Sequence, residues 1–268
     1  MKQRQTESVN LDHIRVVLVE PTHPGNIGSV ARAMKTMGLN HLVLVKPKKF
    51  PHYEASKLAA GAESVLLDAQ VVETALEAVS DCTMVLGTSV RDREVSWPTF
   101  DPKISASNVY AHLSDGNKQH RVAVLFGRES SGLTNSEMDL CQAQIRIDAN
   151  PEYSSLNLAN AVQIIAYELR VRLLVSHDGQ TQTNSQARSQ AATKEQQEGH
   201  LQHLQKTMEA LDFVKVNPPT VLMRKLTRLY NKADLSIEEI QILRGILSAV
   251  EAEIESKASG CKVFGEKS

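Results

Sequence analysis

The fold class is indicated most clearly by residues 122–133, VAVLFGRESSGL. Val122–Phe126 is an unbroken run of five apolar residues, which is typical of a parallel strand buried on both faces. Gly127, Arg128 and Glu129 follow directly, so this strand releases charged groups at its carboxyl end. Open α/β sheets bind their ligands at that edge, and we therefore expect a functional site there.

Similar short apolar runs recur through the first 175 residues. Ile14–Val19, Leu42–Val45 and Met84–Leu86 predict further buried strands, Ala143–Ile147 is a weaker fifth candidate and Val65–Leu67 is a sixth. Helical stretches are expected between them, at about residues 27–38, 55–61, 73–79, 105–113, 134–141 and 156–175. The alternation of strands and helices predicts an α/β domain with a mostly parallel sheet.

The composition changes after residue 175. Residues 177–199 contain six Gln and no apolar residue except alanine, so they cannot bury enough surface to offset the entropy of ordering. We interpret them as a flexible linker, with a polar solvent-facing helix over 187–199 as the alternative. Apolar periodicity then returns and predicts three helices, at 200–211, 219–233 and 236–255, the last with a start signal formed by Ser236 and Glu239.

These patterns divide the chain into four parts. We expect an α/β domain over 1–175, a linker over 176–199, a small helical module over 200–256 and a frayed tail over 257–268.

The charge of the chain is nearly balanced. It has 268 residues, with 30 Lys+Arg against 31 Asp+Glu and a net charge of −1, which argues against a polycation that binds nucleic acid through bulk charge. Residues 213–233 nevertheless hold five bases and no acid. Arg224, Arg228 and Lys232 share one helix face, roughly opposite three leucines. Such a face is equally compatible with a solvated surface and with contact to a phosphate backbone.

Several classes of protein are excluded by what the sequence lacks. Cys82, Cys141 and Cys261 are odd in number, far apart and in no CxxC pair, which argues against a disulfide framework and a cysteine zinc site. The histidines form no HxxxH or HxH pair, so no metal is expected. The polar N-terminal stretch and the short apolar runs predict neither a signal peptide nor a membrane span, and we expect a soluble, cytoplasmic protein.

The first polar cluster lies at residues 20–34, between a strand and a helix. Asn26, Ser29 and Arg32 are spaced to lie near one helix edge, and the amides of a helix N-terminus suit an anion. The spacing of Gly25 and Gly28 fits neither a dinucleotide fingerprint nor a P-loop. The alternative is an N-cap at Asn26 followed by two exposed polar residues.

Two further predicted strand exits are polar. Residues 86–93, LGTSVRDR, end a strand in small hydroxyl residues and continue to two arginines, while residues 154–160 carry two Ser and two Asn at a helix start. Ordinary loops and caps are the alternative in both places. No metal set, paired-carboxylate dyad or nucleophile elbow accompanies them. The pattern suits a small organic cofactor held by backbone and a polyanionic substrate held by arginines.

Three of these clusters resemble the motifs of a known superfamily. They are Asn26-x-x-Ser29-x-x-Arg32, FGRESSGL at 126–133 and PEYSSLNL at 151–158. They look like the three motifs of SPOUT-superfamily RNA ribose 2'-O-methyltransferases, in particular the bacterial tRNA (cytidine/uridine-2'-O)-methyltransferases. The resemblance covers residues 13–175 densely and extends to the arrangement of a linker and a helical module.

The resemblance implies a fold and an activity that the spacing alone does not. It implies S-adenosylmethionine as methyl donor and tRNA as substrate, with the methyl group placed on the 2'-OH of the nucleotide at position 32 of the anticodon loop. It also implies a homodimer whose active site uses residues of both subunits. The catalytic SPOUT domain is expected to end in a deep trefoil knot, a feature that is nearly absent from other folds.

The resemblance also assigns roles to residues of this chain. Cofactor binding falls on Thr88, Ser89, Val90, Gly127, Ile147, Ser154, Ser155 and Leu156. The catalytic residue is Arg32, supported by Ser155 and Asn157, and the site is shaped by Asn26 and Glu129. RNA contacts are expected from Arg93 and Arg128 and, in the helical module, from Arg224, Arg228 and Lys232.

Two matters stay open at the level of sequence. Arg32 either acts as a base or orients the nucleotide, because free guanidinium does not lose its proton near neutral pH. The main alternatives to the implied function are a related ribose methylase for another tRNA or rRNA position and a non-catalytic RNA-binding protein. A nucleotide-binding hydrolase is disfavoured because the chain has no phosphate loop.

Overall fold

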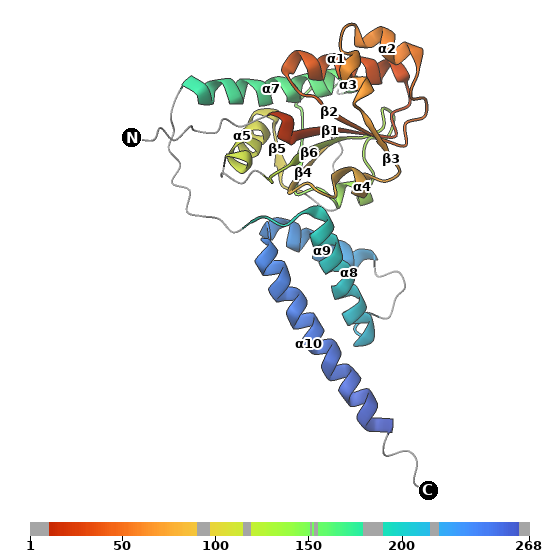
Figure 1. The fold of residues 1–268 in the computed structure, drawn as a ribbon, viewed down its shortest axis with the longest axis vertical. Helices are drawn as coiled ribbons and strands as arrows, with labels where there is room; N and C mark the ends of the chain where they lie inside the picture. The colour runs from red at the N-terminus through yellow and green to blue at the C-terminus, as the bar shows by residue number, and fades with distance from the viewer. Residues whose placement is uncertain are drawn as a thin grey trace. The chain divides into compact units, whose positions relative to one another are not determined.

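The computed structural model describes residues 11–89, 97–114, 119–150, 152, 155–178, 190–214 and 220–262. The chain divides into two compact units, Met1–Arg188 and Ser189–Ser268. The described part of the first unit is a parallel sheet with helices on both faces, and that of the second is helical (Figure 1).

The described residues form one seven-stranded sheet in the order β3-β2-β1-β6-β4-β7-β5, and every pair of neighbours is parallel. The strands are β1 Ile14–Val19, β2 His41–Val45, β3 Gln70–Val72, β4 Met84–Thr88, β5 Thr99–Phe100, β6 Val122–Phe126 and β7 Ala143–Ile145. Strand β6 lies between β1 and β4, and β7 lies between β4 and β5. The carboxyl ends of β6, β4 and β7 therefore lie side by side at one edge.

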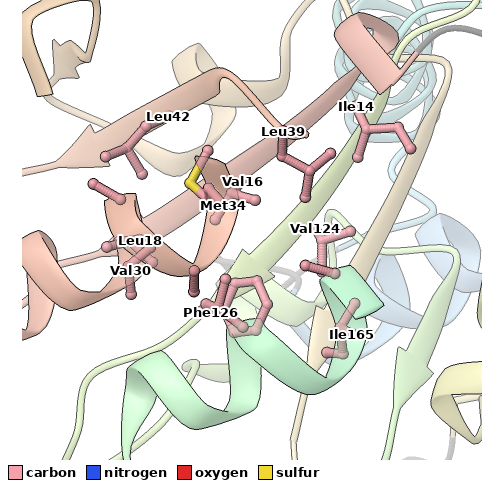
Figure 2. Close-up of a cluster of buried hydrophobic side chains, with 14 of the residues drawn as sticks. Ile14, Val16, Leu18, Val30, Met34, Leu39, Leu42, Val124, Phe126 and Ile165 are labelled. Carbon is pink, nitrogen blue, oxygen red and sulfur yellow. The ribbon is translucent and has the colours of Figure 1, made fainter. Parts of the chain in front are cut away.

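Both faces of the sheet are buried, which explains its unbroken apolar runs. In β1, Val16 and Leu18 face one core cluster, whereas Val17 and Val19 face the other. Helices α1 (Pro24–Met37) and α7 (Leu158–Asp178) cover the first face. Figure 2 shows side chains from both helices against strands β1 and β6, with Val30, Met34 and Ile165 among those labelled. Helices α4 (Ala75–Val79) and α6 (Asn135–Met138) cover the second face.

The remaining helices of the first unit pack around α1 and α7. They are α2 (Tyr53–Ala59), α3 (Glu63–Leu67) and α5 (Pro102–Leu113), and a 3-10 turn (Leu11–His13) precedes β1. The contact between α1 and α2 requires a glycine, because a Cβ at Gly28 would lie 2.1 Å from the carbonyl oxygen of Ala55. This close approach fixes α2 and the loop before it against α1.

The described part of the second unit consists of α8 (Lys194–Ala210), α9 (Thr220–Ala233) and α10 (Ile237–Lys262). The buried ammonium of Lys194 donates to Gln197 Oε1 at 2.9 Å and to Asn231 Oδ1 at 2.8 Å, which links α8 to α9. The predicted start signal of the last helix is confirmed, since Ser236 Oγ accepts from the backbone N–H of Glu239 at 3.2 Å.

The structure confirms the α/β class with a parallel sheet and corrects several boundaries. Val65–Leu67, the sixth strand candidate, belongs to α3. The true additional strands, β3 and β5, have only three and two residues, and no residue in either is fully buried, so neither has the apolar run that identified the others.

The second unit also begins and ends differently from the prediction. Residues 194–199, expected as linker, are helical, because Thr193 and Gln196 form a capping box and Lys, Glu and Gln favour helix. Helix α10 continues to Lys262, so residues 257–262 are helical rather than frayed. Residues 179–189 and 263–268 lie outside the described residues.

Candidate active site

A hydrogen-bond network joins the three motifs. Asn26 Nδ2 donates to Glu129 Oε1 at 2.9 Å, and Asn157 Nδ2 donates to Asn26 Oδ1 at 3.1 Å. Asn157 Oδ1 in turn accepts from the backbone N–H of Ala159 at 2.8 Å, in the first turn of α7. Side chains more than 100 positions apart in the sequence therefore meet, and the three clusters form one site.

Glu129 also holds the start of α1. Its carboxylate accepts from the backbone N–H groups of Thr22, at 3.1 Å, and His23, at 3.3 Å. The N-cap residue His23 makes no capping hydrogen bond through its own side chain, so the negative charge at this helix end comes from the segment after β6. Burial acts to raise the pKa of Glu129, but hydrogen bonds from Asn26 and from backbone amides outweigh it and hold the pKa below 4.5.

Arg32 lies two turns into α1 and is exposed. Among the described residues its guanidinium makes no hydrogen bond or ion pair. The other end of its helix is also held, since Arg170 Nη1 of α7 donates to the carbonyl oxygen of Met37 at 3.3 Å. A cation on an anchored helix, with no partner in the described part of the chain, is available to an anionic substrate.

The loop after β4 is fastened to both neighbouring strands. Thr88 Oγ1 donates to the carbonyl oxygen of Leu125 in β6 at 3.0 Å. The backbone N–H of Ser89 donates to Ile145 of β7 at 3.2 Å, and the Gln144 amide donates to the carbonyl oxygen of Ser89 at 3.1 Å. Two of the predicted cofactor residues, Thr88 and Ser89, are thus held rigidly at the carboxyl edge.

The turn after β6 folds back on its own backbone and requires glycine at its first position. A Cβ at Gly127 would lie 2.1 Å from the carbonyl carbon of Gly132 and 2.2 Å from the nitrogen of Leu133. The turn closes through backbone hydrogen bonds between Arg128 and Gly132, at 2.8 and 3.3 Å. This closed turn follows β6, next to the loop after β4, and Ile147 after β7 is half-buried. These are the strand ends to which the resemblance assigns cofactor binding.

The other predicted site residues are placed as follows. Ser155, Leu156 and Asn157 are exposed, with 37% of Leu156 accessible. Val90, Arg93 and Ser154 lie outside the described residues. In α9, Arg224 and Arg228 are half-buried and Lys232 is exposed.

Three further expectations concern the apolar face of α9, metal binding and membrane spans. The predicted apolar face of α9 is only partly covered, because Leu229 is 60% exposed. The described residues contain no group of three or more His, Cys, Asp or Glu that could hold a metal ion. Nor does any helix among them combine the length and apolar character needed to cross a membrane.

Arg128 is engaged by two carboxylates. Its guanidinium donates to both oxygens of Glu20, at 2.7 and 3.0 Å, and to both oxygens of Glu137, at 2.9 and 3.0 Å. Only 19% of the side chain is exposed. Hydrogen bonds to Glu20 and then Glu137 raise the pKa of Arg128, and its hydrogen bond lowers the pKa of Glu20. This geometry favours a positioning role for Arg128 over the predicted RNA contact.

Sequence reasoning missed the two carboxylates that bind Arg128. Glu137 had a recognisable signal, because Thr134 and Glu137 form a capping box at α6. Glu20 follows β1 directly, but no local pattern connects it to a residue 108 positions away. The pairing arises because β1 and β6 are neighbours in the sheet.

Comparison with known proteins places this geometry in a family. The model of the SpoU rRNA Methylase family matches residues 13–167, more than half of the chain. The chain belongs to this family. A second model, described as the C-terminal domain of tRNA methyltransferase TrmJ, matches residues 195–259. Methyl transfer is therefore the chain's class of activity, and the recognition from three motifs is confirmed.

Curated relatives and a solved structure are similar over most of the chain. A tRNA (cytidine/uridine/adenosine-2'-O-)-methyltransferase TrmJ of Pseudomonas aeruginosa is 45% identical over 89% of this chain and 93% of its own length. A tRNA (cytidine/uridine-2'-O-)-methyltransferase TrmJ of Salmonella typhimurium is 45% identical over 92% of this chain and its full length. The crystal structure of TrmJ from Z. mobilis is 35% identical, with a TM-score of 0.76 over 88% of this chain and 98% of that one.

The network around Glu129 predicts a pH-dependent stability. Because its folded pKa lies below 4.5, Glu129 stabilises the fold above that pH, and the contribution is lost as the pH falls through the folded value. Glu129→Gln should lower the free energy of unfolding by about 1 kcal/mol near neutral pH. The difference in the free energy of unfolding between Glu129→Gln and wild type should become smaller as the pH falls below the ordinary range of a glutamate pKa. Urea denaturation followed by the fluorescence of Trp97, the chain's one tryptophan, measures this.

Glu152→Gln is the matched control, because Glu152 is exposed and its carboxylate makes no hydrogen bond among the described residues. A deficit for Glu129→Gln that stays constant down to pH 3 would contradict the assignment.

The two carboxylates around Arg128 predict that its shape matters more than its charge. Arg128→Lys keeps the charge but cannot bridge Glu20 and Glu137 with a planar fork, so stability should fall by about 2 kcal/mol. The salt dependence of tRNA binding should not change. Arg121→Lys is the control, because Arg121 is half-exposed and, within the described part of the chain, pairs only with Asp81, at 3.4 Å. Unchanged stability together with a shallower salt dependence would instead support an RNA contact.

Proposed function

We propose that this chain transfers a methyl group from S-adenosylmethionine to the 2'-OH of cytidine or uridine at position 32 of the tRNA anticodon loop. The observation that carries the proposal is the Asn26–Glu129–Asn157 network, which joins the three motifs. Arg32, on the same helix as Asn26, is exposed and has no ion-pair partner among the residues that the structure describes. The named TrmJ relatives support tRNA and a 2'-oxygen of cytidine or uridine. Position 32 and the cofactor follow from the family resemblance.

S-adenosylmethionine, when bound, supplies a methyl group activated on a sulfonium. We assign its binding to Thr88, Ser89, Val90, Gly127, Ile147, Ser154, Ser155 and Leu156. The assignment is supported by the loop after β4, which is held by hydrogen bonds to β6 and β7, and by the position of the Gly127 turn at the adjacent strand end. Residues at three adjacent strand ends would hold the cofactor mainly through backbone groups, as expected for a crevice at the carboxyl edge.

The chain's own contribution to catalysis is largely alignment. The attacking oxygen must lie in line with the methyl group, and correct orientation supplies a large part of the rate. The Asn157 side chain already binds Asn26 and the backbone of Ala159, so it positions the start of α7. Ser155 and Arg32 are exposed and can meet the nucleotide directly. Exposure of Arg32 in the single chain favours the orienting role over that of a base.

The assembly belongs to the same proposal. We infer a homodimer, supported by two apolar side chains on α7, Tyr167 and Leu174, which are 53% and 51% exposed. A second copy would cover them and complete the surroundings of Arg32. The strand order supports the trefoil knot, because β6 lies between β1 and β4, and β7 lies between β4 and β5, although β6 and β7 come after all of these strands in the chain. Arg93, Arg224, Arg228 and Lys232 would contact tRNA, in the cytoplasm where tRNA is used.

Mass mapping of tRNA after incubation with enzyme and S-adenosylmethionine tests the activity and the position together. We expect one added methyl group, on the ribose at position 32. A DNA analogue should stay unmodified, because the 2'-OH is the group that distinguishes RNA. Arg32→Ala should lower kcat about 100-fold or more while S-adenosylmethionine binding, measured by calorimetry, stays unchanged.

Thr36→Ala, one turn further along the exposed side of α1, is the control. Absence of cofactor binding, with or without tRNA, would refute the methyltransferase proposal. A methyl group at another tRNA or rRNA position would identify a related ribose methylase. RNA binding without any methyl transfer would identify a non-catalytic RNA-binding protein. Activity of Arg32→Lys with a shifted pH profile would support a base, whereas loss of RNA binding in Arg32→Ala would support orientation.

The basic face of α9 predicts a salt-dependent contribution to tRNA binding. Removing one lysine from a phosphate contact should reduce the slope of log affinity against log salt by about 0.7–0.9. Lys232→Gln is suited to this test, because Lys232 is exposed. Lys206→Gln, at an exposed site of α8, is the control. Equal slopes of log affinity against log salt for wild type, Lys232→Gln and Lys206→Gln would indicate that the basic face of α9 is a solvated surface and does not contact tRNA.

A further inference from the structure

A second concentration of positive charge lies in the first unit, outside the three motifs. Residues 46–53, KPKKFPHY, follow β2 and contain three lysines and no acid; we call them the lysine loop. Lys46, Lys48 and Lys49 are all exposed, and the loop ends at Tyr53, the first residue of α2, which is 79% exposed. The loop therefore brings three exposed cations and one exposed aromatic ring together within eight residues of the chain.

The lysine loop is held beside the candidate active site. The backbone N–H of Lys48 donates to the carbonyl oxygen of Pro21 at 3.2 Å. Pro21 directly precedes Thr22, whose backbone N–H is bound by Glu129. At its other end the loop enters α2, which packs against α1 at Gly28. The loop is therefore fixed against the same segment and the same helix that carry Asn26 and Arg32.

The side chains of the lysine loop are available to a partner. Among the described residues, the ammonium groups of Lys48 and Lys49 make no hydrogen bond or ion pair, and neither does the Tyr53 hydroxyl. Within the described part of the chain, Lys46 has one long pair, with Glu73 at 3.8 Å, and both groups are largely exposed. Beside the hydrogen bond from Arg128, the charges of Lys46 and Lys48 also help to lower the pKa of Glu20. Holding the backbone while leaving the charged ends free is an arrangement that suits a polyanion.

We propose that the lysine loop is a second RNA-binding surface, on which Lys48 and Lys49 contact phosphates and Tyr53 stacks on an unpaired base next to the target nucleotide. The inference rests on the proposed function for the identity of the RNA, a tRNA loop. Single-stranded RNA is recognised by cations that follow the backbone and by aromatic rings that stack on bases. An acidic protein would use the lysines but has no flat base for the exposed ring.

The test is tRNA binding over a range of salt concentrations by the full-length protein. Lys48→Gln and Lys49→Gln should each reduce the slope of log affinity against log salt by about 0.7, the value for single strands. Tyr53→Ala should weaken binding about tenfold and Tyr53→Phe should not, because stacking needs only the ring. The control is Lys103→Gln, at an exposed site of α5. S-adenosylmethionine affinity should match wild type throughout, and the loss should appear in the KM for tRNA.

The outcomes separate this inference from the proposed function. If an active Lys48→Gln,Lys49→Gln variant kept the wild-type salt slope and the wild-type KM for tRNA, the RNA-binding role of the lysine loop would be overturned. The proposed methyltransferase function would not be affected. Equal affinities for Tyr53→Ala and wild type would overturn the stacking. Binding of polyglutamate by wild type but not by the double variant, with tRNA binding unchanged, would indicate an acidic protein and overturn the RNA assignment. Failure of the wild type to methylate any RNA would refute the proposed function instead.

Discussion

The carboxylate of Glu129 is the group on which the site depends. It binds two backbone amides at the start of α1 and, through Asn26, reaches Asn157 at the start of α7. Helix α1 has no side-chain cap of its own, so its start is held by a residue from the end of β6. Protonation or loss of this one carboxylate would loosen the ends of three segments together.

The charged groups at and around the candidate active site fall into two sets, one paired inside the fold and one exposed. Glu129, Arg128, Glu20 and Glu137 are paired with one another or with backbone, and they hold the turn after β6 against β1 and α6. Arg32, Lys48 and Lys49 have no such partners among the described residues and point their charge outward. A net charge of −1 conceals this division. Glu20, Glu129 and Glu137 make internal contacts, whereas these three cations of the proposed RNA surface have no ion-pair partner of this kind among the described residues.

Prediction from the sequence succeeded where burial imposes a local pattern. β1, β2, β4 and β6 were recognisable because both faces of a parallel sheet are covered, which forces a continuous apolar run. Strands β3 and β5 lie at the two edges of the sheet and are short, so they carry no such run. Val65–Leu67 shows the converse, an apolar triplet that packs as one turn of α3. A run of three apolar residues is too short to distinguish the repeat of a helix from that of a strand.

The α/β class, the three motifs, the helical second unit and the start of its last helix at Ser236 could be recognised in the sequence, because each depends on residues close together in the chain. Three contacts became visible only in the folded chain: Arg128 binds Glu20 and Glu137, Glu129 caps α1, and the lysine loop lies against the segment carrying Asn26. The physical reason is strand order. β6 lies beside β1 although about 100 residues separate them, and hydrogen-bond partners follow distance in space, which no local pattern of residues records.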